Sequence, residues 1–318
     1  MSEFEIIRNH FLRDYDRSDI NVGVGDDGAI LNIDQMIGSQ LVVSTDTIVE
    51  QTHFPEGTIA GNIARRAMCI NLSDMAAMGA LPLWFTLSLT LPGDKANEEW
   101  LREFSSGLFE IASRYNCALI GGDTTKGPLS VTICMFGNMP SNSGLKRSSA
   151  SVGDIIYLSG SIGGSRAALE LINSKGNISK RLLSIFYAPT PMIDLGIKLR
   201  NIATSCIDVS DGLVADLSHI CRASRVSAKM HLATLPFDEE VKTLFPDKYT
   251  EFGLSGGDDY QLCFTVPKHL KDSIQLVSTQ TGITLTAIGE IVEFDHSQAI
   301  TINGIEDQLN VRGYDHFD

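Results

Sequence analysis

The sequence predicts an α/β (α+β) protein built from two domains. Its 318 residues suffice for two domains of ordinary size, each with its own core. Apolar, strand-like runs alternate with segments of helical periodicity, a pattern typical of α/β proteins. A small, polar stretch at 140–151 interrupts this alternation, which then starts again. We therefore expect one domain over 1–140 and a second over 150–318.

The first domain is expected to contain helices and strands in alternation. The clearest helix is the segment 60–78, whose apolar residues recur at helical spacing and would form one buried face. Those residues are Ile63, Ala67, Ile70, Met75 and Met78. The other expected helices span 3–13 and 97–115. The expected strands span 40–46, 83–91, 118–120 and 129–137.

The second domain repeats the alternation. A strand over 154–159 is followed by a glycine turn at 160–164 and a helix over 165–172. Pro189 and Pro191 precede a further helix, because proline disfavours helical backbone before it. The remaining expected elements are a helix over 213–223 and strands over 260–266, 284–291 and 299–302.

Composition restricts the class of protein. The hydrophobic fraction of 43% and the charged fraction of 20% are ordinary for a soluble protein, and no apolar run is long enough to span a bilayer. A net charge of −14 argues against nucleic-acid binding, which needs a basic surface. The N-terminus lacks the pattern of a signal peptide, so we expect a cytoplasmic protein without membrane partners. The six cysteines are scattered without a C-x-x-C pair, which favours reduced core residues.

Aspartates recur beside glycines or at predicted strand ends. Each alone is ordinary turn chemistry, and only the recurrence suggests a shared role. Asp74 lies in an apolar helix and Asp46 follows an apolar strand, where a carboxylate needs a partner or a metal ion. Basic residues are sparse around these motifs, and oxygen ligands without histidine or cysteine clusters favour Mg²⁺ or Mn²⁺. The motifs are Gly25-Asp26-Asp27-Gly28, Ser44-Thr45-Asp46-Thr47, Asn71-Leu72-Ser73-Asp74, Gly121-Gly122-Asp123-Thr124, Asp208-Val209-Ser210-Asp211-Gly212 and Gly256-Gly257-Asp258-Asp259.

Two glycine motifs resemble nucleotide-binding loops only superficially. Gly23, Gly25 and Gly28 fit G-x-G-x-x-G, but a strand rather than a helix is expected after them. The turn at 160–164 lacks the Gly-Lys-Ser/Thr ending of a P-loop. Neither G-x-S-x-G nor a histidine with signature neighbours indicates a nucleophilic triad. His53 is still of interest, because it follows Asp46 closely on an expected loop.

Taken together, these segments resemble the thiamine-monophosphate kinase family within the larger aminoimidazole-ribonucleotide (AIR) synthetase-like superfamily. The resemblance runs over nearly the whole chain and is specific in order and spacing. His53-Phe54 and the tail Gly313-Tyr314-Asp315-His316-Phe317 favour the kinase over its superfamily relatives. The other matching segments are Gly25-Asp26-Asp27-Gly28-Ala29, Ser44 to Thr47, Asn71 to Gly79, Leu119 to Thr125, Ile207 to Leu213 and Leu254 to Tyr260.

The resemblance implies an AIR synthetase-like fold and ATP-dependent phosphorylation of thiamine monophosphate, by direct in-line transfer assisted by several Mg²⁺ ions. It also implies a homodimer whose N-terminal domains pair through their sheets, with the active site in the cleft between the domains. Of the site residues, Asp211 and Arg147 are expected to act in catalysis. The implied metal ligands are Asp27, Ser44, Thr45, Asp46, Asp74, Asp123, Asp208 and Asp211. The implied ATP contacts are Gly122, Asp123, Arg147 and Ser210, and the implied substrate contacts are His53, Asp258 and Tyr314.

One position departs from the family pattern, which commonly has glutamate where this chain has Asp258. Aspartate keeps the charge but withdraws it by one methylene. Two other functions stay open at this point. The chain could be another ATP-using AIR synthetase-like enzyme, such as a purine-pathway synthetase or a selenophosphate synthetase. It could also be an acidic metal-binding module without enzymatic activity.

Overall fold

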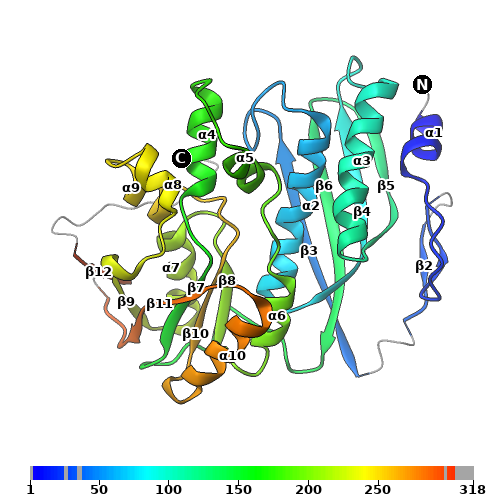
Figure 1. Cartoon of the computed structure of the whole chain (residues 1–318). Coiled ribbons are helices and arrows are strands. Elements are labelled where there is room, and N and C mark those ends of the chain that lie inside the picture. Colours follow the sequence, from blue (N-terminus) through cyan, green and yellow to red (C-terminus); the bar gives the residue numbers. More distant parts are fainter. Residues whose placement is uncertain (1–2, 25–27, 34–37, 297–298, 305–318) are drawn as a thin grey trace. The chain divides into compact units, whose positions relative to one another are not determined.

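The structure, a computed structural model, describes residues 3–24, 28–33, 38–296 and 299–304. The chain forms two compact units (Figure 1). The first unit comprises 1–75 and 80–142, and the second comprises 76–79 and 143–318. Among the described residues, no helix combines the length and apolar character that crossing a membrane requires. A cytoplasmic location stays a prediction.

The first unit is built on a four-stranded sheet in the order β3-β6-β4-β5. β3 pairs antiparallel with β6, β6 antiparallel with β4, and β4 parallel with β5. Figure 1 shows the two long helices, α2 and α3, running along this sheet. The strands are β3 (Ser39–Val49), β4 (Leu81–Leu91), β5 (Ala118–Lys126) and β6 (Ser130–Pro140), and the helices are α2 (Ala60–Ala77) and α3 (Glu98–Arg114). The unit also contains α1 (Glu3–Ile6), a π-helical turn (Ile7–Phe11), β1 (Ile20–Val22) and β2 (Ile30–Leu31).

The two faces of this sheet differ in their side chains. Along β3, Val42 and Ile48 are buried, whereas Leu41 and Val43 are 54% and 52% exposed. Successive side chains of a strand point to opposite faces, so at β3 one face packs against the helices and the other is open. Further across the sheet, Trp84 and Ala118 are buried on that second face, packed against Tyr15, Ile20 and Leu31. The buried face of α2 agrees with the periodicity of the sequence. Ile63, Ala67, Ile70 and Met75 are at most 5% exposed, and Met78 is half-buried just after the helix.

The second unit is built on a six-stranded sheet in the order β12-β9-β11-β7-β10-β8. Its pairs are antiparallel except β12 with β9, which is parallel. A large core cluster, including Ile156, Leu217 and Ile288, packs α7 against this sheet. The strands are β7 (Ile155–Ser159), β8 (Ser205–Asp208), β9 (Ser227–His231), β10 (Leu262–Val266), β11 (Leu285–Val292) and β12 (Ile300–Asn303). The α-helices are α4 (Gly164–Asn173), α5 (Lys180–Tyr187), α6 (Ile193–Leu199), α7 (Leu213–Ser224), α8 (Glu239–Leu244), α9 (Tyr249–Ser255) and α10 (Lys271–Thr281), with 3₁₀ turns at Leu232–Thr234 and Lys268–Leu270.

The mixed α/β class predicted from the sequence is confirmed, with two corrections of detail. Asp46 was expected to end its strand, and Asp123 to lie in a glycine turn. Both lie inside strands, because β3 extends to Val49 and β5 extends to Lys126. The six cysteines are free, and all but Cys134 are buried, as expected for reduced core residues. Burial raises the pKa of the Cys69 and Cys117 thiols to about 12, which keeps them unreactive.

Candidate active site

In the first unit, β3 and α2 bring three of the predicted metal ligands together. Ser44 and Asp46 lie on the helix-covered face of β3, two residues apart. The hydroxyl of Ser44 donates a hydrogen bond to Oδ2 of Asp74 on α2. The backbone N–H of Asp46 donates to Oδ1 of Asn71 at 3.1 Å, one helical turn before Asp74. The sheet and the helix therefore hold Ser44, Asp46 and Asp74 as one group of oxygen donors.

Asn71 orients this group from within the core. Its side chain is buried, and its Nδ2 donates to the carbonyl oxygen of Ala67 at 2.9 Å, so its Oδ1 is directed at the strand. Asp74 itself is half-buried. A partly exposed carboxylate is accessible to a cation, and its two oxygens together offer about four lone-pair positions. The residue that looked out of place in an apolar helix is thus at the edge of the core.

Two other predicted ligands, Thr45 and Asp123, lie on the open face of the sheet. Thr45 is exposed, between the inward residues Ser44 and Asp46. Asp123 is also exposed and pairs with the exposed Ser88 of β4. β6 and β4 lie between β3 and β5, so about 14 Å separates Asp123 from β3 at the usual strand spacing. Since Mg²⁺ binds its ligands at about 2.1 Å, Asp123 and Asp46 of one chain cannot contact the same ion.

Gly122 has a structural reason to be glycine. Its φ is +155°, and a Cβ atom there would lie 1.9 Å from the carbonyl oxygen of Leu87. Leu87 is its register partner on β4. Only glycine lets the two backbones approach this closely. Gly122 therefore fixes where β5 presents Asp123.

His53, a predicted substrate contact, lies in the turn that follows β3. Its Nδ1 accepts the backbone N–H of Val49 at 3.1 Å, so the neutral ring carries its proton on Nε2. The carbonyl oxygen of His53 accepts a hydrogen bond from Nε of Arg66 at 3.1 Å. Arg66 is 1% exposed and belongs to α2. The turn is thus tied to the same helix that carries Asp74.

In the second unit, the end of β8 and the loop that leads to α7 carry Asp208, Ser210 and Asp211. Asp208 ends β8 and is buried, while Ser210 and Asp211 are half-buried. Asp211, Asp216 and His219 each offer one possible ligand atom, either a carboxylate oxygen or a ring nitrogen. These three atoms lie within 4.8 Å of one another. The loop and the first two turns of α7 therefore form a second cluster of candidate ligands.

The charged groups of this second cluster shift one another's pKa values. Burial raises the pKa of Asp216 to about 8, and the carboxylates of Asp208 and Asp211 add to this rise. Burial lowers the pKa of His219, and the positive charges of Arg147 and Arg222 lower it further, whereas Asp211 opposes the shift. Arg147 is exposed, so its guanidinium is accessible to solvent. The charges of the two predicted catalytic residues, Asp211 and Arg147, therefore shift the pKa of His219 in opposite directions.

Asp258, a predicted substrate contact, belongs to a backbone turn of rare conformation. Asp258 and Tyr260 have φ values of 61° and 50°, which residues with side chains seldom adopt. The hydroxyl of Tyr260 donates to Oδ1 of Asp258 at 3.0 Å. The neighbouring Asp259 is buried and accepts the N–H of Gly163, and burial raises its pKa to about 8. The two adjacent carboxylates therefore differ in their surroundings.

Two predicted site residues, Asp27 and Tyr314, lie outside the described residues. Four further residues lie in these clusters although the sequence analysis did not name them as site residues: Asn71, Asp216, His219 and Tyr260. Asp216 and His219 are three residues apart on α7, which places them on one helix face. That spacing, directly after the Asp208-Val-Ser-Asp211 motif, is the signal that could have found them.

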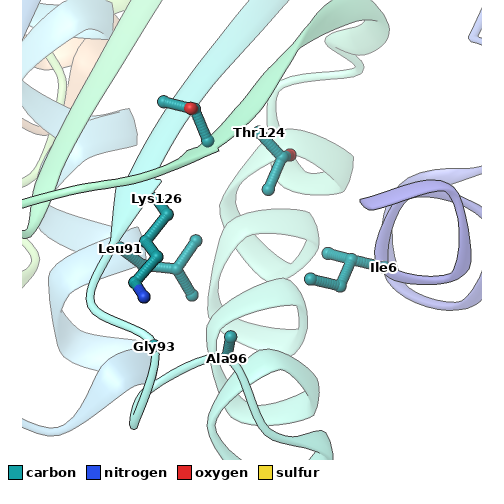
Figure 2. Close-up of a pocket in the computed structure, with 7 residues that line it drawn as sticks. Ile6, Leu91, Gly93, Ala96, Thr124 and Lys126 are labelled. Carbon is teal, nitrogen blue, oxygen red and sulfur yellow. The ribbon is translucent and has the colours of Figure 1, made fainter. Parts of the chain in front are cut away.

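Two cavities lie apart from these clusters. In the first unit, a cavity of about 450 Å³ lies beside the ends of β4 and β5. Figure 2 shows Ile6 facing this cavity from α1, opposite Leu91 and Lys126. In the second unit, a cavity of about 340 Å³ is lined by Arg181, Asp238 and Asp259, among others. In the second cavity, Arg181 already pairs with Asp238 through two hydrogen bonds of 2.6 and 2.8 Å. The described residues that line the first cavity include no carboxylate. Within the described part of the chain, neither cavity therefore offers the grouped carboxylates found around β3 and α7.

Comparisons with known proteins show which family the chain belongs to. The family model described as "AIR synthase related protein, N-terminal domain" matches residues 25–139, and the one described as "AIR synthase related protein, C-terminal domain" matches 151–302. The chain is 40% identical to the thiamine-monophosphate kinase of Escherichia coli strain K12 over 322 residues, covering 99% of this chain and 98% of that protein.

Two solved structures are similar over most of their length. The thiamine-monophosphate kinase from Stenotrophomonas maltophilia K279a has a TM-score of 0.85 and 38% identity, with 94% of this chain and 95% of that one covered. A structure described as "AaThiL complexed with AMPPCP and TMP" has a TM-score of 0.79 and 29% identity, with 92% of each chain covered. The AIR synthetase-like fold expected from the sequence is confirmed. The chain belongs to the thiamine-monophosphate kinase family of AIR synthase related proteins.

Proposed function

We propose that this chain transfers the γ-phosphoryl group of ATP to thiamine monophosphate, forming thiamine diphosphate and ADP. The observation that carries this proposal is the full-length match, at 40% identity, to an enzyme named thiamine-monophosphate kinase. A similar solved structure is described as complexed with AMPPCP, an analogue of ATP, and TMP. The donor types present at the site suit phosphoryl transfer, which depends on positioning and charge neutralisation more than on covalent chemistry.

We further propose that several Mg²⁺ ions assist the reaction. The chemistry of the donor set fits this ion, because Ser44, Asp46 and Asp74 offer only hard oxygen atoms. Asp208 and Asp211 offer two further carboxylates in the second unit, and the other proposed ligands are Asp27, Thr45 and Asp123. Bound Mg²⁺ would neutralise charge on the phosphates and orient them.

The residues of the chain itself would bind and orient the two substrates. The exposed guanidinium of Arg147 can take up charge on the transferring phosphoryl group. Ser210 would contact ATP, and His53, Asp258 and Tyr314 would hold thiamine monophosphate. The ionised phosphate of that substrate is itself the nucleophile. Its oxygen bonds to the γ-phosphorus while the bond to the ADP oxygen breaks, so no general base is needed.

We also propose that the chain works as a homodimer through the open face of its first sheet. Leu41, Val43 and Leu81 are 54%, 52% and 44% exposed at one end of this face, where a second copy would cover them. Asp123 lies on the same face, too far from Asp46 to share an ion with it. In such a dimer, Asp123 of the partner subunit would approach Thr45 on the open face of β3, the edge strand that also carries Asp46, and would add a carboxylate at that edge.

Subunit complementation tests this arrangement. Asp123→Asn and Asp74→Asn should each be nearly inactive alone. If Asp123 serves the partner's site, refolding the two variants together yields hybrid dimers with one intact site, and about a quarter of the wild-type rate returns. If no activity returns although hybrid dimers form, Asp123 acts within its own chain and the shared site is wrong.

The activity itself is tested by ADP release. Purified protein with ATP and Mg²⁺ should release ADP rapidly only when thiamine monophosphate is added. Equal release with aminoimidazole-ribonucleotide precursors or with selenide instead would favour another AIR synthetase-like enzyme. Calorimetry that finds Mg²⁺ binding without nucleotide binding would favour a metal-binding module.

A further inference from the structure

Asp216 controls the conformation of the loop that carries Ser210 and Asp211. It lies in the first turns of α7 and is 2% exposed. Its Oδ2 accepts hydrogen bonds from three successive backbone N–H groups, those of Ser210 at 3.0 Å, Asp211 at 3.0 Å and Gly212 at 3.1 Å. Three donors on one oxygen fix the direction of three successive peptide units.

The other edge of the same loop is bound to the turn that carries Asp258. The backbone N–H of Asp258 donates to the carbonyl oxygen of Ser210 at 2.7 Å, and that of Tyr260 donates to Val209 at 2.8 Å. At Gly257 there is no room for a side chain, since a Cβ atom would lie 2.5 Å from the carbonyl oxygen of Ser210. The loop is therefore held between Asp216 on one edge and the Asp258 turn on the other.

A carboxylate in this place is costly for folding. Asp216 is buried beside two further carboxylates, Asp208 and Asp211, which repel its charge. An ordinary side-chain N-cap would come from position 212, where this chain has Gly212 and therefore no capping side chain. Asp216 instead reaches back from inside the helix to residues that precede it. This arrangement serves the loop more than the helix.

We propose that Asp216 is a positioning residue for phosphoryl transfer. Through the three N–H groups, it presents Ser210 and Asp211 to the nucleotide and its metal ions, and it keeps Asp258 at a fixed distance from them. The inference rests on the proposed roles of Ser210, Asp211 and Asp258 in the kinase reaction. A residue that merely stabilised α7 would lower the melting temperature without changing the metal requirement.

Two variants of Asp216 and one matched control separate these roles. Asp216→Ala removes the acceptor, whereas Asp216→Asn keeps one oxygen that can accept the same N–H groups. The control is Asp154→Ala, because Asp154 is also buried in the second unit and accepts the N–H of Ser151 and the hydroxyl of Thr204. Asp154 is not among the residues proposed to contact substrate, nucleotide or metal.

The expected results are specific for positioning. Asp216→Ala should raise the Mg²⁺ concentration for half-maximal velocity by about tenfold and lower kcat by about 10–100-fold, since partners that orient metal ligands have effects of this size. Asp216→Asn should recover most of both losses. Asp154→Ala should lower the melting temperature but leave the Mg²⁺ requirement unchanged. An unchanged Mg²⁺ requirement in Asp216→Ala, or an equal change in Asp154→Ala, overturns the proposal.

A binding measurement keeps this test independent of turnover. Calorimetric titration of AMPPCP with Mg²⁺ should give about tenfold weaker binding to Asp216→Ala than to the wild type, with Asp216→Asn in between. If Asp216→Ala does not fold, Asp216→Ser takes its place, because its shorter side chain withdraws the acceptor from the three N–H groups. A wild-type affinity for AMPPCP and a wild-type Mg²⁺ requirement in that variant would overturn the proposal. A wild-type protein that binds AMPPCP but forms no thiamine diphosphate would contradict the proposed function and leave this inference standing.

Discussion

Replacing Gly122 by alanine separates a backbone role of this residue from a nucleotide contact. The new Cβ would lie 1.9 Å from the carbonyl oxygen of Leu87, whereas real Cβ contacts essentially never fall below 3.0 Å. β4 and β5 must therefore separate locally by about 1 Å, which breaks one or two ladder hydrogen bonds at about 1 kcal/mol each. The φ of +155° adds about 1–2 kcal/mol for a residue with a side chain. Together these effects should destabilise the first unit by about 3 kcal/mol.

The assay is thermal unfolding followed by circular dichroism, with Gly121→Ala as the matched control. A loss of about 3 kcal/mol should lower the Tm of the first unit by about 10 °C. At Gly121 a Cβ atom would meet only Thr86 Cγ2, at 3.9 Å, so this variant should stay within about 2 °C of the wild type. A Gly122→Ala variant with the wild-type Tm but weakened ATP binding would refute the reasoning and make Gly122 a nucleotide contact.

Three further substitutions test separate parts of the site. Asp46→Asn should lower turnover by orders of magnitude while the Tm is retained, because a metal ligand is lost; near-normal formation of thiamine diphosphate would remove Asp46 from the site. Asp258→Glu lengthens a proposed substrate contact and should change the KM for thiamine monophosphate by about 3–10-fold, the effect of one hydrogen bond, but not the KM for ATP; an unchanged KM means that this position does not touch the substrate. Asp259→Asn tests the raised pKa of about 8. The folded wild type holds a proton there that the unfolded chain releases above about pH 4, so its stability falls as the pH rises towards 8. Urea unfolding at several pH values should show a smaller fall for Asp259→Asn, and parallel curves would mean that the carboxyl is not protonated in the folded protein.

Long periodic elements could be predicted from the sequence, and short or buried ones could not. The helix expected over 60–78 is α2 (Ala60–Ala77), because its buried face repeats at helical spacing. β8 (Ser205–Asp208) was missed, since four buried residues show no alternation. The extension of β5 through Gly121 and Gly122 was also missed. Glycines normally indicate a turn, but here the close partner strand, β4, requires the glycine at position 122.

The sequence predicted which residues belong to the candidate site better than it predicted which of them contact one another. The sequence named Ser44 and Asp74, but the hydrogen bond between them depends on β3 packing beside α2. It also named Asp46 and Asp123 as ligands, and only the strand order shows that they lie at opposite edges of the sheet. Asp216 was missed because its role depends on backbone N–H groups, which no residue type reveals.

The central claim is tested most directly by following the labelled γ-phosphate of ATP. Purified protein is incubated with γ-labelled ATP, thiamine monophosphate and Mg²⁺, and the products are separated by chromatography. The account predicts that the label appears as the terminal phosphate of thiamine diphosphate, in amounts equal to the ADP formed, and that a chelator abolishes the transfer. Label that remains in ATP, or that is released only as inorganic phosphate, would contradict it.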